Sequence, residues 1–277
     1  MNYPIIDPII FSIGPLAVRW YGLSYLAGFA LAYYLGLRQI KSRFPSFNEN
    51  DVSDMVFYGA IGGVIGGRLG SVLFYNFDRF LADPLYLVRM WEGGMSIHGG
   101  FVGAIIALWL FGRRTNRSFW SVADFVAPLT PTGLGFGRLG NFANTELPGR
   151  VTDSALGVHY PCAADAIRAI TMTCTEQYEA VARHPSSLYQ AFAEGVVLFA
   201  VVWWFASRPR NPGMISGVFL LGYGVLRMIT EAFRLPDAHI GYLGGAFTMG
   251  QLLSLPVAIA GVVLIVLGAR GKLARRP

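Results

Sequence analysis

Seven apolar stretches, each about as long as a helix that crosses a lipid bilayer, dominate this sequence of 277 residues. They cover roughly residues 16–37, 53–75, 96–112, 119–138, 186–207, 214–232 and 247–269. Only 14% of the residues are charged, against about 25% in soluble domains. Because a chain in lipid must satisfy its own backbone hydrogen bonds, we predict an all-α integral membrane protein. Its seven transmembrane helices would form a single membrane domain over residues 1–277.

Lysine and arginine are unevenly shared between the connections that follow alternate stretches. The dense flanks hold Arg38, Lys41, Arg43, Arg113, Arg114, Arg117, Arg208, Arg210, Arg270, Lys272, Arg275 and Arg276. By the positive-inside rule these flanks are cytoplasmic, which places the N-terminus outside and the C-terminus in the cytoplasm. The formal charge of +6 therefore reflects topology. We expect no nucleic-acid partner, because the basic residues are not interleaved with base-stacking aromatic residues.

Two polar or broken segments lie outside the apolar stretches. Residues 139–184 form the only long polar insertion, and the predicted orientation makes them a small periplasmic cap after the fourth helix. Cys162 and Cys174 fall within it, and the sequence leaves open whether they form a disulfide, because spacing alone does not fix the required geometry. The first fifteen residues are apolar but interrupted by three prolines, and we expect them to lie along the outer membrane interface.

Glycine is frequent within the stretches, as in "GAIGGVIGGRLG" at residues 59–70. Small residues spaced three or four apart allow membrane helices to approach closely, so we expect most of these glycines to serve helix packing. A phosphate-binding P-loop is a poor alternative, since no lysine follows the glycines in the required position.

Ionisable side chains inside the apolar stretches are costly in lipid and indicate a functional site. Four arginines, one histidine and one tyrosine gather in the outer third of the predicted membrane, or at its outer surface: Arg19, Arg68, Arg138, Arg227, His98 and Tyr21. Guanidinium groups match the oxygen pairs of phosphate and stay charged at any relevant pH. The pattern therefore predicts a pocket for an anion, of which a phospholipid headgroup is the obvious example at this depth.

Each of these residues also has a structural alternative. Arg19 could extend to the outer headgroups, and His98 could simply bond a backbone carbonyl. Arg68 could pair with an acid elsewhere in the chain. Arg227 could form a buried ion pair with Glu231, four residues further along the same helical face. Arg138 is harder to explain structurally, because a polar run follows it at once.

The motifs that the sequence lacks restrict the chemistry further. It contains no G-x-S-x-G elbow, no H-E-x-x-H pair and no clustered histidine and carboxylate ligands. We therefore expect neither a metal nor a cofactor. A histidine beside fixed positive charge can still deprotonate a nucleophile, while arginines stabilise a phosphate leaving group.

The block "GRLGNFANTELPGR" (137–150) resembles the signature of the bacterial prolipoprotein diacylglyceryl transferase family. Further similar blocks follow the family's order along nearly the whole chain: "RWYGLSYLAGF" (19–29), "GGRLGSVLFYN" (66–76), "GGMSIHGGFVGA" (93–104), "RHPSSLYQ" (183–190), "GYGVLRMITEAFRLPD" (222–237) and "MGQLLSLP" (249–256). The resemblance implies a seven-span inner-membrane enzyme. Such an enzyme moves the diacylglyceryl group of phosphatidylglycerol onto the lipobox cysteine of a preprolipoprotein, forming a thioether and releasing glycerol phosphate.

The resemblance also implies roles for individual residues. His98, Arg138 and Arg227 match the family's essential residues, and we expect them to be catalytic. Those expected to bind substrate or lipid are Tyr21, Arg68, Asn141, Glu146, Gly149 and Tyr223. The implied partners are phosphatidylglycerol, the signal peptide of the preprolipoprotein and membrane lipids, and we expect the chain to act as a monomer.

One position departs from the family's pattern, because Thr145 stands where the family usually has glycine. If that glycine supplies a positive φ, threonine would be strained there. Two other functions remain open on the sequence alone. A transporter or flippase for anionic lipids could use the same arginines, but it predicts a polar path to the inner side, which the sequence does not show. The second open function is that of an inactive protein that binds lipoprotein precursors.

Overall fold

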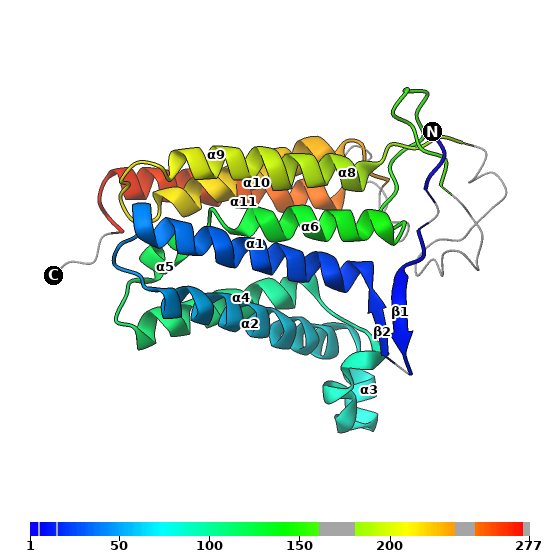
Figure 1. The fold of residues 1–277 in the computed structure, drawn as a ribbon, viewed down its shortest axis with the longest axis horizontal. Coiled ribbons are helices and arrows are strands. Elements are labelled where there is room, and N and C mark those ends of the chain that lie inside the picture. The colour runs from blue at the N-terminus through cyan, green and yellow to red at the C-terminus, as the bar shows by residue number, and fades with distance from the viewer. Residues whose placement is uncertain (5, 15, 161–180, 236–246, 274–277) are drawn as a thin grey trace. The chain divides into compact units, whose positions relative to one another are not determined.

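A computed structural model describes residues 1–4, 6–14, 16–160, 181–235 and 247–273. The chain is mostly helical (Figure 1), and it divides into two compact units. The first combines Met1–Leu35 with Val126–Ala274, and the second contains Gly36–Phe125. The first helix, α1 (Trp20–Ser42), begins in the first unit and ends in the second.

The second unit is built on two closely packed helices, α2 (Glu49–Tyr75) and α4 (Ile97–Arg114). Short elements connect them: α3 (Phe77–Ala82) and the 3₁₀ turns η1 (Pro84–Val88) and η2 (Met90–Glu92). A Cβ atom at Gly66 would lie 2.3 Å from the carbonyl oxygen of Gly99, so only glycine permits this crossing. Cβ atoms at Gly62 and Gly70 would also lie too close to α4, which confirms the packing role predicted for most glycines of this stretch. Cβ atoms at Gly59 and Gly63 would have no neighbour within 4 Å.

The first unit begins with a hairpin, which the apolar pattern of the sequence did not predict. Strands β1 (Ile9–Ile13) and β2 (Leu16–Arg19) pair antiparallel, with Phe11 opposite Val18. The described part of the chain is therefore helical with one small sheet, and Arg19 ends a strand instead of opening a helix.

Several helices also belong to the first unit (Figure 1). They are α6 (Thr130–Ala143), α10 (Met214–Glu231), α11 (Met249–Ala269) and a continuous helix made of α8 (Ser186–Gln190), the π-helical η3 (Ala191–Val197) and α9 (Leu198–Phe205). Helix α11 begins with a capping box, in which Thr248 and Gln251 satisfy each other's backbone N–H groups.

The fourth apolar stretch differs from the single helix predicted over 119–138. Helix α5 (Phe119–Val126) ends before Pro128, and α6 starts at Thr130 and runs on to Ala143. Pro128 and Pro131 explain the break, because proline lacks an N–H donor and disfavours helical backbone in the residue before it. In the part of the chain that the structure describes, four helices are long and apolar enough to span a membrane: Glu49–Tyr75, Ser186–Phe205, Met214–Glu231 and Met249–Ala269. Seven crossings remain a prediction.

The described part of the predicted cap is tied to the chain's first residues. Tyr3 donates its backbone N–H to the His159 carbonyl at 3.0 Å and packs in a small core with Val158 and Tyr160. Its hydroxyl donates to the carbonyl of Phe142 at 2.7 Å, at the end of α6. Burial raises the pKa of Tyr3 to about 12. Cys162 and Cys174 lie outside the described residues.

Candidate active site

Helix α6 crosses the π-helical segment η3 at a pair of glycines. A Cβ atom at Gly195 would lie 2.6 Å from the Cα of Gly135, so the two backbones are nearly in contact. This crossing places Arg138, one turn beyond Gly135, against Glu194. The Nε of Arg138 donates to Oε2 of Glu194 at 3.2 Å. The Glu194 side chain is completely buried, whereas that of Arg138 keeps 14% of its surface exposed.

A second arginine shares the same carboxylate. Arg227, on α10, lies with Nη1 3.5 Å from Oε1 of Glu194 and with Nη2 3.0 Å from Oε2 of Glu231. The ion pair between Arg227 and Glu231 that the sequence left as an alternative is thus confirmed, but the same guanidinium also reaches Glu194. Glu231 in turn lies 3.6 Å from Nη1 of Arg234 and accepts a hydrogen bond from Thr248 at 3.2 Å.

These ion pairs form one continuous chain, which we call the ion-pair cluster: Arg138, Glu194, Arg227, Glu231 and Arg234. Three cations and two anions leave it with a formal charge of +1. Burying such charges costs several kcal/mol per ion unless each is paired, so the pairing explains how the arginines remain charged inside an apolar protein. A site with excess positive charge in these surroundings attracts an anion.

Glu194 was not among the site residues predicted from the sequence. The signal was present, because Glu194 is the one acidic or basic residue between Ser186 and Phe205, a candidate membrane span. The π-helical backbone at this point is a second indication, since π-bulges are frequent at functional sites.

The turn after α6 holds the next predicted residues together. Asn141 and Asn144 both donate side-chain N–H groups to Glu146, at 2.6 and 3.1 Å. Thr145 has a φ of +55°, which confirms that this position requires the backbone conformation glycine adopts easily. Leu147 has a φ of +57°, so the turn contains two such residues.

Gly149 closes this turn against two other segments. Its N–H donates to the His184 carbonyl at 2.9 Å, and the next residue, Arg150, donates to the Phe233 carbonyl at 2.9 Å. A Cβ atom at Gly149 would lie 2.4 Å from the His184 carbonyl oxygen. The structure therefore gives this glycine a packing role that connects the turn to the end of α10.

The predicted tyrosines border the cluster. Gly140 allows α1 to approach α6, because a Cβ atom there would lie 3.0 Å from the Tyr21 ring. The Tyr21 hydroxyl lies 3.2 Å from that of Tyr25, and Tyr21 interacts electrostatically with Glu146 and Arg138. On α10, Tyr223 interacts in the same way with Glu194, Arg227 and Arg138.

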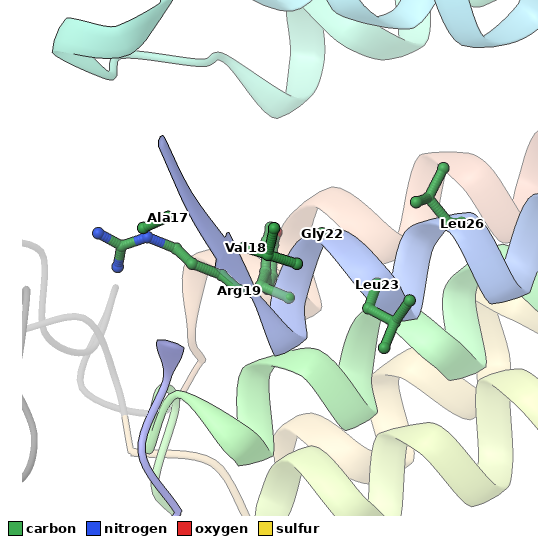
Figure 2. Close-up of a pocket in the computed structure, with 7 residues that line it drawn as sticks. Ala17, Val18, Arg19, Gly22, Leu23 and Leu26 are labelled. Atoms are coloured by element: carbon green, nitrogen blue, oxygen red, sulfur yellow. The ribbon is translucent and has the colours of Figure 1, made fainter. Parts of the chain in front are cut away.

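An open hollow of about 520 Å³ adjoins Tyr21 where β2 meets α1 (Figure 2). Arg19 is exposed at one end of the hollow and Leu26 lies at the other, with Val18 and Leu23 along its wall. The hollow therefore combines an apolar wall with a cationic end.

Arg68 and His98 belong to the second unit and are described within it. The five N–H donors of Arg68 all point at backbone carbonyls, those of Tyr86, Leu87, Arg89, Gly93 and Gly94. Arg68 thus organises the connection between α3 and α4, and it pairs with no acid among the described residues. His98 is exposed in the first turn of α4, which Ser96 caps by accepting the N–H of Gly99 at 3.2 Å.

Of the predicted residues, the structure brings together Tyr21, Arg138, Asn141, Glu146, Tyr223 and Arg227. Among the described residues, no group of three histidine, cysteine, aspartate or glutamate side chains could hold a metal ion.

Long apolar helices around a paired arginine cluster define a multi-pass membrane protein with a buried, cationic polar site. The comparison with known proteins then specifies the family. The sequence matches the family described as prolipoprotein diacylglyceryl transferase over residues 8–267, and the chain belongs to that family.

Curated relatives carry the name phosphatidylglycerol–prolipoprotein diacylglyceryl transferase. The protein from Vibrio cholerae is 50% identical over 266 residues, which cover 96% of this chain and 93% of the relative. The protein from Idiomarina loihiensis is also 50% identical, over 96% of this chain and 94% of its own. A third relative, from Xanthomonas axonopodis pv. citri, is 50% identical over 96% of this chain and 92% of its own length.

Proposed function

We propose that this chain transfers the diacylglyceryl group of phosphatidylglycerol to the lipobox cysteine thiol of preprolipoproteins. The observation that carries the proposal is the ion-pair cluster, in which Arg138 and Arg227 share the buried Glu194. The names of the relatives and the family match over nearly the whole chain support the same reaction.

In this proposal Arg138 and Arg227 hold the lipid's phosphodiester, because a guanidinium matches two phosphate oxygens at once. Arg138 uses its Nε for Glu194, which leaves its two terminal nitrogens for an anion. Asn141 and Glu146 then contact the polar glycerol headgroup, and Tyr21 and Tyr223 position the lipid. The hollow beside Tyr21 suits sideways entry of the lipid from the bilayer, since its wall is apolar.

The reaction is a displacement at carbon. The thiolate of the lipobox cysteine attacks the glycerol carbon bonded to the phosphate oxygen, so a sulfur–carbon bond forms as the carbon–oxygen bond breaks. The bonding electrons move to the phosphate oxygen, and glycerol phosphate leaves with its charge stabilised by the two arginines. A free thiol has a pKa of about 8.5, so a base is needed near neutral pH, and we assign His98 to that role. The geometry at Arg68 favours a structural role, so we leave it out of the lipid contacts.

The membrane arrangement completes the proposal. We place the protein in the bacterial inner membrane with seven crossings, the N-terminus outside and the C-terminus in the cytoplasm. Residues 139–184 then form a periplasmic cap, and the active site opens towards that side. The protein acts as a monomer in this account.

The experiment is transfer of label from radioactive phosphatidylglycerol to a synthetic lipobox peptide, with purified protein in detergent. We expect labelled peptide and released glycerol phosphate with the cysteine peptide, and neither with a peptide in which serine replaces the cysteine. If no label reaches the thiol although the protein is folded and binds the lipid, the transferase proposal fails. A lipid transporter would instead move labelled lipid between leaflets of a vesicle without any peptide.

A further inference from the structure

Glu194 places a negative charge beside the two arginines that hold the phosphate in the proposed site. It is completely buried, and it contacts both Arg138 and Arg227. A structural account would explain it as compensation for two buried arginines. Because Glu194 contacts both guanidinium groups, its negative charge also acts on an anion that both arginines hold.

We propose that Glu194 is a positioning and specificity residue, which makes the site select a lipid phosphodiester over a phosphomonoester. The inference rests on the proposed function of the same site. With Glu194 in place the ion-pair cluster has a formal charge of +1, which matches the single negative charge of a phosphodiester. A phosphomonoester carries a second charge above its second pKa of about 6, and Glu194 repels it.

The geometry supports both parts of this role. Glu194 accepts from Nε of Arg138 at 3.2 Å, so it holds that guanidinium at its inner nitrogen. Arg227 is held between Glu194 and Glu231, so its plane is fixed from two sides.

The backbone shows that the placement is specific. Glu194 precedes Gly195, the residue whose missing side chain lets η3 touch α6 at Gly135. Glu231 occupies space that Gly250 leaves for it, because a Cβ atom at Gly250 would lie 2.5 Å from its Oε1. One carboxylate is thus placed by a close backbone crossing and the other by a glycine beside it.

The test measures lipid binding instead of transfer, so that its result does not depend on the reaction. Displacement of a fluorescent phospholipid from the purified protein at pH 8 gives the affinities for phosphatidylglycerol and for phosphatidic acid, whose headgroup is a phosphomonoester. Glu194→Gln keeps the shape of the side chain and removes its charge. We expect this variant to raise the affinity for phosphatidic acid relative to phosphatidylglycerol by about tenfold or more, because one charge is removed within a few Å of the ligand.

Three further variants make the result decisive. Glu231→Gln removes one charge of the same cluster without touching Arg138, and we expect it to shift the ratio in the same direction. Glu194→Asp keeps the charge and should retain the wild-type ratio of the two lipid affinities. Asp51→Asn removes a carboxylate from the ion pair with Arg117 in the second unit, at 2.8 Å, and should leave the ratio unchanged.

An unchanged ratio in both glutamine variants would overturn the inference, even if wild-type protein transfers lipid to the peptide. A shifted ratio would support it, even if the transfer assay fails. If Glu194→Gln does not fold, the Glu231→Gln and Glu194→Asp variants still decide the question.

Discussion

Thr145 shows how a single residue can store strain at the edge of the site. Its φ of +55° lies in the left-handed region, where a β-branched side chain is crowded by its own backbone. The turn nevertheless holds this conformation, because Asn141, Asn144 and Glu146 bond across it.

Replacing Thr145 with glycine should therefore stabilise the protein by about 1 kcal/mol, the order of the cost of a left-handed residue. In thermal unfolding in detergent this corresponds to a rise in Tm of roughly 2–4 °C. Thr152 is a suitable control, because it is not among the residues with positive φ and its hydroxyl accepts the N–H of Ser154. Thr152→Gly should lower Tm, and an equal rise in both variants would show that strain is not the cause.

Tyr3 gives a second prediction at this scale. Burial raises its pKa from 10.0 to about 12, so the unfolded chain releases the phenol proton at lower pH than the folded protein does. The stability that Tyr3 contributes is therefore complete below pH 10 and is lost as pH rises towards 12. Between these pH values, the free energy of unfolding of the wild type should fall more steeply with pH than that of Tyr3→Phe. Identical pH profiles would contradict the burial of the phenol.

Among the structural elements, the crossing of α6 and η3 does most to create the site, since it brings Arg138 to Glu194. The sequence predicted the arginines, because charge inside an apolar stretch stands out. It did not predict the break at Pro128, the hairpin of β1 and β2, or the role of Glu194. The break and the hairpin are local features, set by two prolines and by two adjacent strands, but hydropathy reports polarity and not backbone conformation. The role of Glu194 depends on contacts with Arg138 and Arg227, which are far from it in the chain.

A methyl group at this crossing should separate the two elements. Gly195→Ala places a Cβ atom 2.6 Å from the Cα of Gly135, so the helices must move apart and the contact between Arg138 and Glu194 must lengthen. We expect transfer to fall by about tenfold or more, because misplacement by 1 Å is costly in catalysis. Gly133→Ala is the matched control on α6, since its Cβ atom would meet nothing within 4 Å. Equal activity in both variants would contradict the account of the crossing.

At the scale of the whole molecule, the proposed mechanism assigns the base to His98, which lies on α4 in the second unit. If His98 is the base, His98→Gln should lower transfer at pH 7 by about 100-fold, the lower range for general base catalysis. Raising the pH to about 9.5 should recover most of the loss, because the peptide thiol then ionises without help. A deficit that stays constant with pH would assign His98 a structural role.

The most direct test of the central claim is the rate of diacylglyceryl transfer by Arg138→Lys. Lysine keeps the positive charge but loses the planar fork that holds two phosphate oxygens. The control is Arg113→Lys, at an exposed position in the last turn of α4. We predict that kcat/KM for phosphatidylglycerol falls by about 100-fold or more in Arg138→Lys and stays at the wild-type value in Arg113→Lys. Undiminished transfer by folded Arg138→Lys would show that this arginine does not hold the phosphate.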